Sequence, residues 1–173
     1  MLRKIVLFII ISICFVLQTT MFQAISFANI SPNLLIIVVS SFGFMRGKKE
    51  GLLVGFFCGL LMDIFWGAYL GIYALLYMYI GCLNGLFQKR FYPDDIKLPM
   101  LLIAASDLVA NFFIYFFMFF FRSRFDFSYY FTSIILPELV YTMVITIFLY
   151  IILLKANQKL EVYEKRRAIK FDL

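Results

Sequence analysis

Six apolar runs, separated by short polar or charged stretches, make up almost the whole chain. A helix needs about 20 apolar residues to cross the hydrocarbon of a bilayer. A chain of 173 residues has room for six such crossings and for little else. The pattern predicts an all-α integral membrane protein, with a six-helix transmembrane bundle at 1–154 and a basic cytoplasmic tail at 155–173. The predicted helices are Ile5–Phe22, Pro32–Met45, Gly51–Phe65, Ala68–Gln88, Leu98–Phe121 and Tyr129–Leu154.

The composition excludes several other classes of protein. Apolar residues make up 64% of the chain and charged residues 15%, whereas a soluble domain is about half apolar and a quarter charged. The chain has no histidine, which is the commonest general base and metal ligand. Cys14, Cys58 and Cys82 each lie inside an apolar run, as small buried hydrophobic residues do. We therefore expect no enzymatic activity, no metal and no cofactor.

The ends of the predicted helices carry their own signals. A basic start before a long apolar run could be a signal peptide, but no clean cleavage site follows, so an uncleaved first helix is favoured. Ser31, Pro32 and Asn33 mark the start of the second helix, with serine as the cap and proline in the first turn. We expect this short helix to continue through the charged stretch 46–50. Pro137 predicts a kink in the sixth helix.

The basic residues predict the orientation. With six crossings, 14 of the 16 Lys and Arg residues lie at the end that holds both termini, and only Arg122 and Arg124 lie at the other. Lys and Arg are enriched in cytoplasmic segments, so both termini are predicted to lie in the cytoplasm. The net charge of +6 then reflects topology and attraction to anionic lipid, and we expect no nucleic-acid partner.

All nine glycines lie between residues 43 and 85, and many are spaced by four residues. In the third predicted helix they form a stripe of small residues that ends at an aspartate. Such a stripe lets two membrane helices approach closely. It predicts either packing within the bundle or docking of a partner's membrane helix. The candidate residues for helix packing or partner docking are Gly51, Gly55, Gly59, Asp63, Gly67, Gly71, Gly81 and Gly85.

Three acids, Asp63, Asp107 and Glu138, fall inside predicted membrane helices. An ionised acid facing lipid at mid-membrane costs about 3 kcal/mol or more, so each should face the bundle, a partner or water. We expect different depths: Asp63 in the outer half, Asp107 in the inner half and Glu138 near the middle. Asp63 is placed to cap or brace the turn after the third helix. The roles of Asp107 and Glu138 stay open between hydrogen bonding to polar neighbours and a proton or cation path.

Residues 31–85 resemble the family of the rod shape-determining protein MreD. The resemblance rests on the Pro32-Asn33 helix start, on Gly55-Phe56, Gly59 and Asp63, and on the pair Leu70-Gly71. It implies a non-catalytic scaffold of the bacterial inner membrane. It also implies partnership with MreC, indirectly with the MreB filament, and with wall synthases of two kinds, a SEDS glycosyltransferase and a transpeptidase. The bundle is expected to be similar to that of the substrate-binding subunits of vitamin transporters.

Two other functions are weighed against the scaffold. A substrate-binding subunit of an energy-coupling-type vitamin transporter would need an outward cavity lined by polar side chains, and the predicted outer loops offer no such cluster. A channel or proton-coupled carrier would need its three acids to converge, which the expected depths argue against. The scaffold is therefore favoured.

Overall fold

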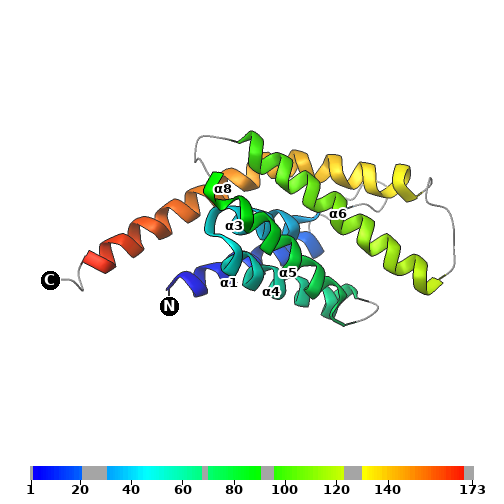
Figure 1. Ribbon diagram of the computed structural model, residues 1–173, viewed down its shortest axis with the longest axis horizontal. Coiled ribbons are helices and arrows are strands. Elements are labelled where there is room, and N and C mark those ends of the chain that lie inside the picture. The colour runs from blue at the N-terminus through cyan, green and yellow to red at the C-terminus, as the bar shows by residue number, and fades with distance from the viewer. Residues whose placement is uncertain (1, 21–30, 68–69, 91–95, 123–129, 170–173) are drawn as a thin grey trace.

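The computed structural model describes residues 2–20, 31–67, 70–90, 96–122 and 130–169, and within these ranges every regular element is helical. Each of the six apolar runs contains a helix (Figure 1). The prediction of an all-α chain is confirmed. The elements are α1 (Leu2–Thr19), α3 (Leu34–Arg46), α4 (Lys48–Trp66), α5 (Ile72–Asn84), the 3₁₀ helix η1 (Gly85–Arg90), α6 (Lys97–Arg122), the π-helical turn η2 (Phe131–Ile135) and α8 (Leu136–Ile169).

Helix α3 is the centre of the fold. Every residue from Leu34 to Met45 is buried, and the helix contacts α1, α4, α5, α6 and α8. A helix that is apolar on all sides is expected at such a position. Figure 1 shows α6 and α8 together on one side of the molecule and α1, α4 and α5 on the other.

The two ends of α3 differ from the prediction. The N-cap is Asn33, not Ser31, and Pro32 lies before the helix; the Asn33 side chain accepts a hydrogen bond from the backbone N–H of Ile36 at 3.3 Å. The helix also does not continue through the charged stretch. It ends at Arg46 because Gly47 adopts φ 95° and ψ −177°, a conformation almost restricted to glycine, and α4 begins at Lys48.

Helices α4 and α5 form a tight antiparallel hairpin. The N–H of Gly67 closes the last turn of α4 on the carbonyls of Met62 and Asp63, at 3.1 and 3.2 Å. Gly71 then adopts a left-handed conformation with φ 105° and serves as the N-cap of α5. This turn brings the start of α5 beside the end of α4.

The last two helices agree with the prediction in position but extend further. Pro99 lies in the first turn of α6, as expected. A π-helical turn precedes α8, closed by the N–H of Leu136 on the carbonyl of Phe131. Pro137 lies in the first turn of α8 and not inside the helix, so the kink there stays a prediction. Helix α8 continues without a break to Ile169. The predicted boundary between bundle and tail at 154 and 155 therefore falls within one helix of 34 residues.

Two helices in the described part of the chain are long and apolar enough to cross a membrane by length and composition, at Lys97–Phe117 and Phe131–Glu164. Helix α3 is apolar but has only 13 residues, or about 20 Å at 1.5 Å per residue. The start of α4 is charged, with Lys48, Lys49 and Glu50 in its first turn. Among the described residues, the fifth and sixth predicted crossings therefore have the length and composition of a membrane span.

The surface has the opposite polarity to that of a soluble protein. Large apolar side chains point outward on α1, α4, α5, α6 and α8, including Phe8, Phe65 and Phe148, each at least 63% exposed. Polar side chains such as Asn33, Asn84 and Thr142 are instead buried between helices. A buried polar group together with an extensive exposed apolar surface is the arrangement that a lipid environment selects.

Candidate functional site

The glycines of α4 lie where its backbone meets that of α5. A Cβ atom added at Gly51, Gly55 or Gly59 would lie less than 3.0 Å from backbone atoms of α5, a separation that real Cβ atoms essentially never show. The facing backbone belongs to Gly81 opposite Gly51, to Tyr77 opposite Gly55 and to Tyr73 and Ala74 opposite Gly59. The stripe is therefore the internal face of the hairpin.

Other glycines extend this close contact to the end of the hairpin where α4 begins and α5 ends, whereas Gly67 and Gly71, at the turn, make no contact between helices there. Gly43 on α3 also approaches the carbonyl of Gly81, so three helices meet where Gly43, Gly51 and Gly81 lie together. Gly85 packs against the backbone of Gly47 and Lys48. The second interpretation of the stripe, docking of a partner's helix, requires a face that α5 already covers.

Asp63 connects the same two helices by hydrogen bonds. It is 2% exposed, and its carboxylate accepts hydrogen bonds from the backbone N–H groups of Tyr73 at 3.0 Å and Ala74 at 2.9 Å. These N–H groups belong to the first turn of α5, where a helix has no acceptors of its own. A carboxylate is also favoured there by the helix dipole. Asp63 thus caps α5 from the end of α4.

A second polar contact joins α3, α5 and α8. The Asn33 side chain and the Tyr77 hydroxyl exchange two hydrogen bonds, one donated by Asn33 Nδ2 at 2.9 Å and one by the hydroxyl to Asn33 Oδ1 at 3.1 Å. The backbone N–H of Asn33 donates to the Thr142 hydroxyl at 3.2 Å. All three side chains are buried, so Asn33 caps its own helix and ties it to two others.

A third contact, centred on Asn84, joins α5 to α3 and α6. Its Nδ2 atom donates to the hydroxyls of Ser106 at 2.7 Å and Ser40 at 3.3 Å, and to the carbonyl of Ile80 at 2.9 Å. Asn84 thus pairs most closely with Ser106 of α6.

Asp107 and Glu138 lie on different helices, α6 and α8, and their charges interact. Asp107 is fully buried, and neither of its carboxyl oxygens has a hydrogen-bond partner within the described residues. Glu138, in the first turn of α8, is close enough for its charge to interact with that of Asp107. Both also lie within electrostatic range of Tyr77. The charges of these two acids therefore act on each other and on Tyr77, whereas Asp63 accepts hydrogen bonds within the hairpin.

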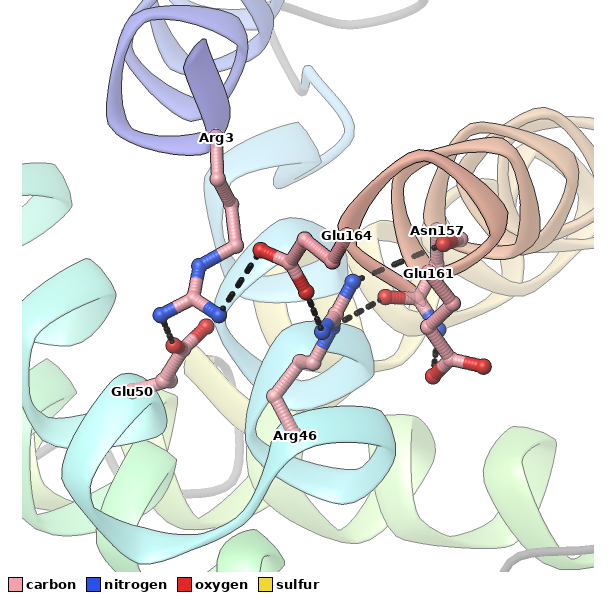
Figure 2. A network of polar contacts seen from close by, with 6 residues as sticks. All are labelled: Arg3, Arg46, Glu50, Asn157, Glu161 and Glu164. Atoms are coloured by element: carbon pink, nitrogen blue, oxygen red, sulfur yellow. Dashed lines mark hydrogen bonds and ion pairs between the residues drawn. The ribbon is translucent and has the colours of Figure 1, made fainter. Parts of the chain in front are cut away.

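The charged side chains at one end of the bundle form a network (Figure 2). Arg3 of α1 pairs with Glu50 of α4 and with Glu164 of α8, the latter at 3.1 Å. Arg46, at the end of α3, pairs with the same Glu164 at 3.2 Å and donates to the side chain of Asn157 on α8. Four helices are joined here. Sequence reasoning missed this network because Arg46 and Glu164 are 118 residues apart.

The remaining chemistry-bearing residues form no cluster in the part of the chain that the structure describes. There, no group of three or more His, Cys, Asp or Glu residues is placed to hold a metal ion. Cys14 and Cys58 are buried, Cys82 is partly buried, and all three are free thiols.

These features define the class first: a helical membrane protein, with apolar surfaces outside and polar contacts between its helices. The family model of the rod shape-determining protein MreD matches residues 1–160. The chain therefore belongs to the MreD family, and its role is in determining rod shape. The resemblance seen at residues 31–85 is confirmed and covers nearly the whole chain. Comparison with curated proteins finds no match, and neither does comparison with solved structures.

Proposed function

We propose that this protein is a non-catalytic scaffold in the bacterial cytoplasmic membrane that maintains rod shape together with MreC and, through MreC, the MreB filament. Family membership supports the role in shape. The observation that supports a scaffold most directly is the network of Arg3, Arg46, Glu50 and Glu164, which joins four helices at one charged end. Such an end gives cytoplasmic partners a rigid surface to bind.

The same network supports the proposed topology of six crossings with both termini in the cytoplasm. It gathers the start of α1, the end of α3, the start of α4 and the C-terminal part of α8. Helices that alternate in direction place these four positions on one side of the membrane. The excess of Lys and Arg assigns that side to the cytoplasm.

The outer surfaces of the bundle are where partner helices would bind. The glycine face is taken up inside the hairpin, whereas α1, α4, α5, α6 and α8 all present large apolar side chains outward. In lipid, helices associate through such surfaces by close packing. The proposed partners are MreC and, in the same assembly, the SEDS glycosyltransferase and the transpeptidase that build the lateral wall.

Cross-linking and pull-down from native membranes test this proposal. We expect the tagged protein to recover MreC, and depletion of the protein to turn rods into rounded cells. Gly55→Ile should abolish both the recovery of MreC and the rod shape of the cells, because a side chain at this position meets the α5 backbone. Phe56→Ile, at a 41% exposed position one residue away, is the matched control. Recovery of energy-coupling ATPase subunits in place of MreC would contradict the scaffold and favour the vitamin-transporter alternative.

A further inference from the structure

Helices α1 and α4 enclose a groove of about 450 Å³ on the outside of the bundle. Helix α1 packs chiefly against α3 and contacts α4 less closely. Space is therefore left between α1 and α4. Phe8, Leu53 and Phe57 are each more than half exposed there. The groove is lined almost entirely by apolar side chains, namely Leu7, Phe8 and Ile11 of α1 with Leu53, Val54 and Phe57 of α4.

One end of the groove is charged. Arg3 and Lys4 of α1 and Glu50 of α4 line it, which leaves a net charge of about +1 at the mouth. Arg3 is held by Glu50 and Glu164. Lys4 is exposed and has no ion pair within the described residues. Both helices also begin at this end, so the positive ends of two helix dipoles point toward it.

The groove is about two thirds as deep as a single leaflet. Lys4 and Ile11 are seven residues apart along α1, or about 10 Å at 1.5 Å per residue. Half of a hydrocarbon core of about 30 Å is about 15 Å. An apolar space of this depth, with Lys4 at its mouth, fits the part of an acyl chain nearest the headgroup, with the headgroup at the surface.

We propose that this groove binds an anionic phospholipid, with an acyl chain along Phe8, Leu53 and Phe57 and the phosphate at Lys4. A partner's membrane helix fits less well on charge grounds. The cytoplasmic flank of such a helix is usually basic, and it would meet the positive charge of Lys4 at the mouth. A phosphate is attracted by the same lysine. The assignment to the cytoplasmic leaflet depends on the proposed topology, but binding itself depends neither on topology nor on the scaffold role.

Native mass spectrometry of the purified full-length protein in detergent tests the site, with phosphatidylglycerol and phosphatidylcholine of identical chains as the probes. We expect retention of one phosphatidylglycerol, with a several-fold preference over phosphatidylcholine. Lys4→Gln should reduce that preference about five-fold, the effect of one lysine near an anionic headgroup. Lys159→Gln, at an exposed lysine outside the groove, should leave it unchanged.

A second pair of variants tests the apolar part. Leu53→Trp adds bulk inside the groove and should weaken retention of both lipids, whereas Leu75→Trp, on α5 and outside the groove, should not; the two leucines are 53% and 55% exposed. Equal retention of both lipids by the unmodified protein would overturn the proposal. Equal effects of Lys4→Gln and Lys159→Gln on the lipid preference would also overturn it. Equal effects of Leu53→Trp and Leu75→Trp on lipid retention would do the same. Loss of MreC recovery with Leu53→Trp and unchanged lipid retention would instead assign the groove to a partner helix.

Discussion

Asp63, three residues before the end of α4, accepts a hydrogen bond at 2.9 Å from the backbone N–H of Ala74 in the first turn of α5. The neighbouring N–H of Tyr73 donates to the other carboxylate oxygen. One side chain therefore satisfies two donors of a helix that has no side-chain cap of its own.

Removing the carboxylate should weaken the hairpin. Asp63→Ala leaves two N–H groups without their acceptors in a buried region, so we expect a loss of about 2 kcal/mol in the free energy of unfolding. Asp63→Asn keeps one acceptor and should cost about half as much. Thermal unfolding in detergent, followed by circular dichroism, measures both. If Asp63→Ala unfolds at the same temperature as the unmodified protein, the capping role is wrong.

The glycine face should tolerate no side chain. In Gly55→Ala the new methyl group would overlap the carbonyl of Tyr77, and separating the two helices should cost about 2 kcal/mol despite the better helix propensity of alanine. Phe56→Ala, on the outward side of the same helix, is the control and should cost much less. Comparable losses in the two variants would show that the close backbone contact does not stabilise the hairpin.

Asn33 and Tyr77 should be energetically coupled. Either Asn33→Ala or Tyr77→Phe breaks the reciprocal pair and leaves the other side chain buried without its partner. The double variant should therefore be more stable than the sum of the single effects predicts, by about 1 kcal/mol in a double-mutant cycle. Tyr79→Phe, at a 63% exposed position, is a control that should show no coupling. Strict additivity of the Asn33 and Tyr77 variants would contradict the predicted coupling.

Arg46 should hold the C-terminal part of α8 against the bundle. Its side chain is 11% exposed and contacts both Asn157 and Glu164. Arg46→Ala should release this part of the helix at a cost of about 1 to 2 kcal/mol, between the values for exposed and buried ion pairs. Limited proteolysis near Lys159 should then be about ten-fold faster. Lys48→Ala, at an exposed lysine two residues away, is the control and should be cleaved at the rate of the unmodified protein. If Arg46→Ala is also cleaved at that rate, Arg46 does not hold this part of α8.

Local features of the fold could be predicted from the sequence because they depend on neighbouring residues. The breaks between apolar runs locate the helices, and the spacing of Gly51, Gly55 and Gly59 indicates a close helix contact. The placement of Asp63 beside the turn follows from the same stripe. The end of α3 could not be predicted, because a charged stretch is compatible with a helix. Only the unusual φ of Gly47 ends it.

Contacts between distant segments could not be predicted. Asn33 meets Tyr77 across 44 residues and Thr142 across 109, and no pattern in one sequence pairs them. Asp107 and Glu138 lie on two different helices, and no pattern in the sequence predicts that their charges interact. The sequence supplied the helices and one close pair of them, whereas the packing around α3 requires the structure.

The central claim is a bundle with both chain ends in the cytoplasm, and cysteine accessibility tests it most directly. In a background without Cys14, Cys58 and Cys82, single cysteines would replace Lys49 at the start of α4, Leu70 in the turn after it, and Lys159 near the C-terminal end of α8. A membrane-impermeant maleimide applied to intact spheroplasts should label Leu70→Cys alone, and Lys49→Cys and Lys159→Cys only after permeabilisation. Labelling of Lys49→Cys or Lys159→Cys in intact spheroplasts would contradict the account.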